Sequence, residues 1–140
     1  MTVVEYEITW GGDPEDASIT TWGTATIEGL GAWVQEGLSD PSYRPGMRIL
    51  IDHSRLDWSG LTPADIHRRI ELFAKEAGRS GHVSAAVVMR APVDFGIARM
   101  EQALIEFQPE VQIDFAVFFS IDEAREWLRA LPKPDPPADC

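Results

Sequence analysis

The chain has 140 residues, 44% of them hydrophobic, and a formal net charge of −11. A chain of this length is expected to form one domain with a hydrophobic core of its own. Because so acidic a surface repels phosphate backbones and anionic lipid headgroups, we do not expect a nucleic-acid-binding protein. Solubility is the simplest interpretation of the charge, and a basic protein partner or a metal-rich environment is the alternative.

The ends of the chain and its cysteine content bear on location. The first residues show no basic segment followed by an apolar run, so we expect no signal peptide. No apolar stretch approaches the roughly 20 residues that a membrane-spanning helix needs, so we expect no stable membrane insertion. The one cysteine, Cys140, excludes an internal disulfide framework. We therefore expect a cytoplasmic protein.

The first 24 residues show strand patterns. From Val4 to Trp10 hydrophobic and polar residues alternate, which predicts a strand with one buried face. Residues 18–24 are rich in Thr, Ile and Trp, which favour a second strand. Because Gly and Pro residues break the pattern between them, the two strands are predicted to form an antiparallel hairpin with a long loop.

A helix is predicted over residues 27–38, where apolar residues recur at helical spacing. Three glycines within it, each costing about 1 kcal/mol relative to alanine, weaken this prediction: Gly29, Gly31 and Gly37. They indicate either close packing of the helix on a sheet or a mobile element beside a site. We favour close packing.

The middle of the chain predicts a buried strand followed by a helix. Residues 47–54 contain a continuous apolar run, which is typical of a strand buried on both faces. Thr62 and Pro63 then predict the start of a helix, because threonine caps free N–H groups and proline has none to leave unpaired. Gly78 or Gly81 is expected to end this helix.

The rest of the chain alternates in the same way. We expect strands at residues 83–89 and 113–119 and a helix at residues 94–107. Ser120 is expected to cap a last helix, whose apolar face runs to Leu131.

The order of these elements predicts an α/β fold. We expect a single mixed, mostly parallel sheet of about five strands, with an N-terminal hairpin and about four helices. The domain is expected to cover residues 1–131. Residues 132–140, with four prolines, are expected to form a flexible tail.

No combination of residues predicts a catalytic, metal or cofactor site. Asp52, His53 and Ser54 have the residue types of a catalytic triad, but neighbours on a strand point to opposite faces. The histidines, His53, His67 and His82, lie on separate predicted elements and lack metal-ligand spacing. No glycine-rich phosphate-binding loop is present. We expect no enzyme, and an enzyme would need groups from distant elements to meet, such as a histidine near Ser59.

The turn after the central strand resembles a known family. Its sequence, Asp57-Trp58-Ser59-Gly60-Leu61, is similar to the Asp-Ser-Ser-Gly-Leu turn of STAS domains, as found in bacterial anti-sigma-factor antagonists. Trp58 replaces the first serine of that turn. Ser59 matches the serine that the antagonists use as their phosphorylation site, although the helix here is predicted to begin about three residues later. The alternative is that Ser59 and Gly60 simply form a turn.

Two further stretches are similar to a subgroup, the SpoIIAA-like (STAS/SEC14-like) proteins. Residues 92–100 resemble that group's aromatic-Gly-x-x-Arg-Met segment, with Phe95 and Arg99 at the matching positions. Residues 117–128 resemble its closing strand and Glu-Ala-x-x-Trp-Leu helix. Together the similarities span roughly residues 3–131.

The resemblance implies two possible functions. The first is a non-enzymatic regulatory or protein-interaction domain, which would bind a partner through Asp57, Ser59, Gly60 and Leu61; a homodimer is also possible. The second is the binding of a small apolar, lipid-like ligand in a pocket bordered by Trp33 and Phe95, with Arg99 as a possible anion-binding residue. The simpler alternatives are that these aromatic residues belong to the core and that Arg99 forms a surface ion pair.

Overall fold

A computed structural model describes residues 4–90, 92–106, 108 and 111–132, without the side chains of residues 79, 80 and 92–95. The described residues form five strands: β1 (Glu5–Trp10), β2 (Ala17–Thr24), β3 (Arg48–Asp57), β4 (Val83–Val88) and β5 (Ile113–Phe118). They also form five helices: α1 (Ile27–Ser39), α2 (Pro63–Lys75), α3 (Ala77–Ser80), α4 (Pro92–Glu106) and α5 (Ile121–Ala130).

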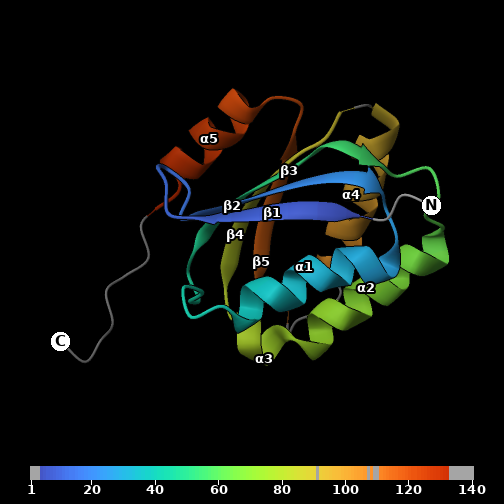
Figure 1. Cartoon of the computed structure of the whole chain (residues 1–140), viewed down its shortest axis with the longest axis horizontal. Helices are drawn as coiled ribbons and strands as arrows, with labels where there is room; N and C mark the ends of the chain where they lie inside the picture. The colour runs from blue at the N-terminus through green and yellow to red at the C-terminus, as the bar shows by residue number, and fades with distance from the viewer. Residues whose placement is uncertain (1–3, 91, 107, 109–110, 133–140) are drawn as a thin grey trace.

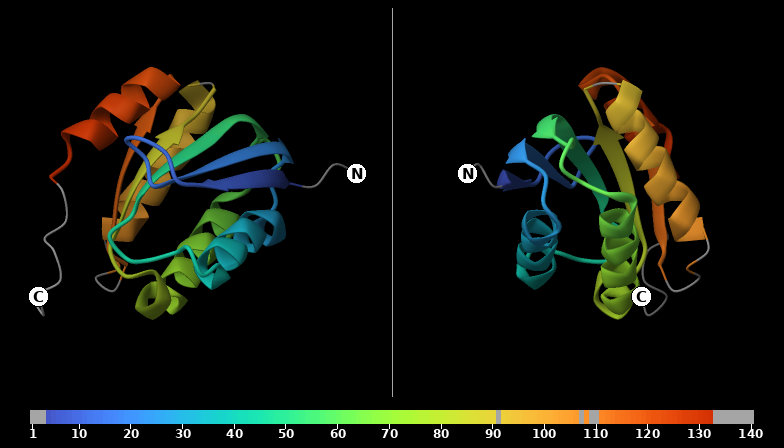
Figure 2. Two further views of the ribbon diagram at one scale, coloured as in Figure 1. Left: turned by 60° about the vertical axis from the view of Figure 1, so that its left-hand side comes forward. Right: turned by 90° about the vertical axis from the view of Figure 1, so that its right-hand side faces the viewer.

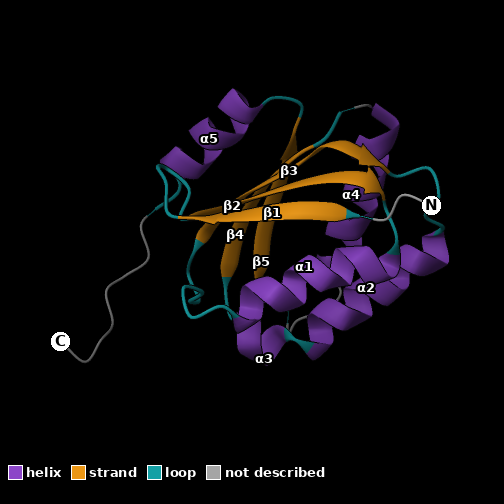
Figure 3. Ribbon diagram, viewed as in Figure 1, coloured by secondary structure: helices purple, strands orange, loops and turns teal. Residues whose placement is uncertain are grey.

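The strands form one sheet in the order β1-β2-β3-β4-β5 (Figures 1 and 3). β1 and β2 are antiparallel, whereas β2 to β5 are all parallel. The mixed, mostly parallel sheet and its N-terminal hairpin are therefore confirmed. Of the described helices, four have ten or more residues and α3 has four.

The central strand is longer than its apolar run predicts. β3 continues three residues past Ser54, because its later residues still pair with β2 from Trp22 to Thr24. The register shifts between Thr20 and Trp22, where β3 has one more residue than β2. The strand therefore carries the chain to the edge of the 57–61 turn.

The sheet separates two layers of helices. On one face α5 packs its Ala124 and Leu128 against Leu50, Ala86 and Val88. The other face is covered by α1, α2 and α4. In Figure 1 α1 and α2 lie together below the sheet and α5 lies above it, and Figure 2 shows the same separation from two further sides.

The helix starts follow from capping. The hydroxyl of Thr62 accepts a hydrogen bond from the backbone of Asp65, whose carboxylate accepts one from the backbone of Thr62, which forms a capping box. Ser120 caps α5 through the backbone of Glu123. Both predicted starts are confirmed.

The predicted end of the second helix was wrong. α2 ends at Lys75, and the short α3 follows before Gly81 closes the segment. Gly81 has a φ of 59°, and a side chain there would also collide with Pro45. The chain needs glycine at this turn, but the regular helix ends before it.

Only one of the three glycines in α1 is explained by close packing. A Cβ atom at Gly29 would lie 2.7 Å from the Cβ of Val4. At Gly31 and Gly37 a Cβ atom would meet nothing within 4 Å.

No helix in the described part of the chain is long and apolar enough to cross a membrane.

Candidate functional site

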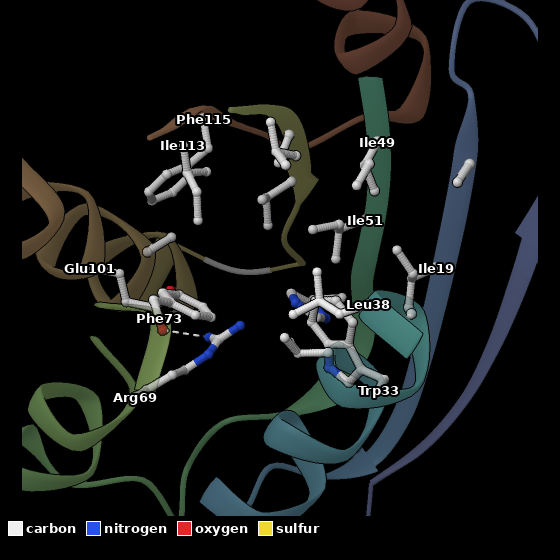
Figure 4. Close-up of a pocket in the computed structure, with 18 of the residues that line it drawn as sticks. Ile19, Trp33, Leu38, Ile49, Ile51, Arg69, Phe73, Glu101, Ile113 and Phe115 are labelled. Carbon is white, nitrogen blue, oxygen red and sulfur yellow. Dashed lines mark hydrogen bonds and ion pairs between the residues drawn. The ribbon is translucent and has the colours of Figure 1, made fainter. Parts of the chain in front are cut away.

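An apolar cavity of about 150 Å³ lies between the sheet and helices α1, α2 and α4 (Figure 4). Strand residues form one wall, and helix residues form the other. The apolar and aromatic wall residues labelled in Figure 4 are Ile19, Trp33, Leu38, Ile49, Ile51, Phe73, Ile113 and Phe115. A cavity of this size holds a molecule on the order of benzene.

Successive side chains of a strand point to opposite faces of the sheet, so only every second one faces this cavity. On β3, Ile49, Ile51 and His53 line it, whereas Leu50 between them packs against α5. The apolar run of the central strand thus supplies two separate cores, and only one of them contains the cavity.

A buried ion pair forms part of the cavity wall. Nη1 of Arg69 on α2 donates to Oε1 of Glu101 on α4 at 2.5 Å, and the two side chains are only 8% and 10% exposed. The guanidinium of Arg69 also lies 5.1 Å from the ring centre of Phe73 and 6.0 Å from that of Trp58. Figure 4 shows Arg69 extending toward the middle of the cavity.

His53 is buried on the same wall. Its Nδ1 lies 2.7 Å from the hydroxyl of Thr21, which is itself fully buried. Burial first, and then the positive charge of Arg69, lower the pKa of His53 to about 3. His53 is therefore a neutral imidazole at pH 7. Its ring contacts Trp58 edge-on at 5.2 Å and Trp33 at 6.0 Å between ring centres.

Three N–H donors on these side chains have no hydrogen-bond partner among the described residues. They are Nε1 of Trp33, Nε1 of Trp58 and Nε of Arg69. A buried donor without a partner costs about 1–3 kcal/mol. Such groups are rare in folded proteins, so three on one cavity wall need an explanation.

The 57–61 turn lies at the end of β3. Oδ1 of Asp57 accepts a hydrogen bond of 2.9 Å from the backbone of Ser59. Hydrogen bonds from the backbone and then the side chain of Ser59 lower the pKa of Asp57. Asp57, Ser59 and Gly60 are exposed, Leu61 is half-buried, and Trp58 turns inward to the cavity.

No protein-family model matches the chain, and no curated protein matches its sequence. Among solved structures, it resembles an uncharacterized protein of the DUF3478 family with a SpoIIAA-like fold, from Shewanella loihica PV-4. The TM-score is 0.57 with 19% identity, over 91% of this chain and 95% of that chain. This chain has the SpoIIAA-like fold. At this identity the similarity shows the fold alone.

Within this SpoIIAA-like fold, the residues that the sequence predicts to bind a ligand do not all lie at the cavity. Trp33 lines the cavity and is 7% exposed. Arg99 lies on the exposed side of α4 and is not part of the cavity wall. The side chain of Phe95 lies outside the described residues. The structure therefore brings Trp33 to the cavity and leaves the 57–61 turn at the surface.

Sequence patterns missed the polar part of the site. Arg69 lies between Ile66 and Ile70 in the buried stripe of α2, and Glu101 shares the buried stripe of α4 with Ala98 and Ile105. A charged residue inside an apolar helical stripe was the available signal. Two such residues of opposite charge on different helices indicate a buried pair.

Proposed function

We propose that this chain is a non-enzymatic domain that binds a small, largely apolar molecule in the cavity beneath α1, α2 and α4. The cavity itself carries the proposal, because protein interiors rarely contain voids larger than a water molecule. Its walls combine aliphatic side chains from all five described strands with aromatic side chains of the helices. A ligand that fills it gains the dispersion contacts that its lining otherwise lacks.

A groove between α1 and α2 supports an access route for the ligand. This groove shares four lining residues with the cavity: Val34, Arg69, Phe73 and Glu76. Leu72, which is 42% exposed, also borders it. An apolar tail that extends beyond the cavity would lie along this groove, so the proposal includes one end of a longer lipid-like molecule.

Methyl NMR titration with cumene tests the proposal. We expect cumene to shift the signals of cavity residues such as Ile19 and Ile51. Ala85 lines the cavity from β4 and is 5% exposed, so Ala85→Leu places three more carbons in it. This variant should bind cumene at least about tenfold more weakly without a loss of stability.

Ala116→Leu is the matched control, because Ala116 lies on β5 outside the cavity wall. It should bind cumene as the wild type does. The proposal would be contradicted by an absence of cumene binding, together with a clean protein mass in native mass spectrometry of protein from its own cells. Equal affinity in the Ala85→Leu variant would contradict it as well.

The exposed 57–61 turn supports a second candidate, a regulatory protein interaction. Ser59 is exposed, and its backbone is fixed by Asp57. Phosphorylation there would add nearly two negative charges beside that carboxylate and would disrupt a contact made by the turn. Phosphopeptide mass spectrometry of native protein should find phosphate on Ser59, and Ser59→Asp should weaken partner capture relative to Ser59→Ala. An unmodified Ser59 and unchanged capture would exclude this role.

A further inference from the structure

We propose that the ligand carries an uncharged oxygen acceptor, such as a ketone, aldehyde or ester carbonyl, which binds at the donor cluster. The donor cluster consists of Trp33, Trp58 and Arg69. This inference rests on the proposed binding function and adds the chemical class of the ligand's polar end.

The donor cluster contains N–H groups that form no hydrogen bond with any described residue. The three residues, each taken as a whole, are 7%, 3% and 7% exposed, and each has an N–H without a partner among the described residues. They are contiguous, because His53 contacts both tryptophans and Arg69 lies over Trp58. A hydrocarbon would leave all three donors unpaired, whereas a carbonyl oxygen has two lone pairs and can accept from two of them.

Pairing requires a local adjustment. All three nitrogens are covered by neighbouring atoms, so an acceptor reaches them only after side chains rotate toward it. The flexible chain of Arg69 and the adjoining cavity leave room for such rotation. The gain is the recovery of hydrogen bonds whose absence is costly in a buried site.

The charge balance of the wall selects an uncharged acceptor. Glu101 already neutralises Arg69 through their hydrogen-bonded pair, and His53 is neutral. The other ionisable side chains on the cavity wall are Glu76 and Tyr43, neither of which adds a positive charge. A carboxylate ligand would therefore bring an uncompensated negative charge beside Glu101, which an apolar site strongly disfavours.

Three probes of similar size test whether the site prefers an uncharged acceptor, a hydrocarbon or an anion. Acetophenone has a carbonyl, cumene replaces its oxygen with a methyl group, and benzoate is an anion. We expect benzoate to bind at least about tenfold more weakly than acetophenone at pH 7, because its charge has no free partner. Titration of each probe, followed by NMR or by tryptophan fluorescence, gives the dissociation constants.

Removal of individual donors tests the hydrogen bonds directly. Trp33→Phe and Trp58→Phe each keep an aromatic wall but lose an N–H. Each should weaken acetophenone binding about threefold to tenfold and change cumene binding by less than about twofold. Trp127→Phe is the matched control, because Trp127 packs against Phe118 on the face of the sheet that α5 covers.

The ion pair supplies a second variant that leaves no lone buried charge. Arg69→Met combined with Glu101→Met removes both charges and keeps the packing. We expect this double variant also to weaken acetophenone selectively relative to cumene. It keeps the test decisive if a tryptophan variant does not fold.

The outcomes distinguish the two proposals. If benzoate binds as tightly as acetophenone, or if the variants weaken acetophenone and cumene equally, the acceptor inference is overturned and the binding function stands. If none of the three probes binds, the binding function and the inference fail together.

Discussion

Arg69 and Glu101 show where residue-by-residue patterns stop being informative. Each is a single charged residue in an otherwise apolar helical stripe, and each alone resembles an irregularity. Their pairing depends on the way α2 packs against α4 and brings the two side chains within hydrogen-bonding distance. The sequence therefore signals that each charge is buried, but periodicity along one helix carries no information about where the two helices meet or that the pair lines a cavity.

His53 provides a residue-scale prediction about pH. The pKa of His53 is about 3 in the folded protein and 6.5 in the unfolded chain. Between these two pH values the imidazole is protonated in the unfolded chain but neutral in the folded protein. The contribution of neutral His53 to stability is complete above pH 6.5 and is lost as pH falls toward 3. The expected slope is about 1.4 kcal/mol per pH unit between pH 6 and 4.

Urea unfolding at a series of pH values measures this slope. His53→Gln should remove it, because glutamine does not titrate. The exposed His67 gives the matched control, and His67→Gln should leave the slope as in the wild type. A His53→Gln variant with the wild-type pH dependence would show that His53 is not buried as a neutral group.

At the scale of elements, capping residues and the spacing of apolar side chains predicted where the longer helices lie, whereas the glycines of α1 did not predict its packing. Thr62 and Ser120 start their helices as expected, because these signals depend on a few adjacent residues. The glycines of α1 suggested close packing, yet only Gly29 approaches another residue. The spacing of glycines does not reveal what lies opposite each one in the folded protein.

The three glycines therefore predict opposite effects of the same substitution. Gly31→Ala and Gly37→Ala should each stabilise the protein by about 0.5–1 kcal/mol, because α1 gains helix propensity without a collision. Gly29→Ala should destabilise it, because the new methyl group would collide with Val4. Chemical denaturation of the three variants measures the differences. Stabilisation by all three would show that α1 does not pack closely at Gly29.

At the scale of the whole molecule, the order of helices and strands along the chain predicts the architecture without any information about contacts. A hairpin followed by alternating helices and strands allows few arrangements, since parallel strands need crossover helices. The cavity is a different kind of property. It arises because side chains from five strands and three helices do not fill the space between them, and no local pattern encodes that empty space.

Because the cavity is lined by the sheet and by helices α1, α2 and α4, its occupation should stabilise the whole fold. A ligand at ten times its dissociation constant stabilises the folded state by about 1.4 kcal/mol if it does not bind the unfolded chain. For 140 residues this corresponds to a rise in melting temperature of about 5 °C. Differential scanning calorimetry with acetophenone at that concentration should show the rise.

The Ala85→Leu variant tests the site of this stabilisation. It should melt at or above the wild-type temperature alone and should lose most of the rise with the same acetophenone concentration, because the leucine occupies the ligand's space. Ala116→Leu should keep the full rise. An equal rise in all three proteins would mean that acetophenone acts outside the cavity, since stabilisation from the cavity requires that the ligand fit within it.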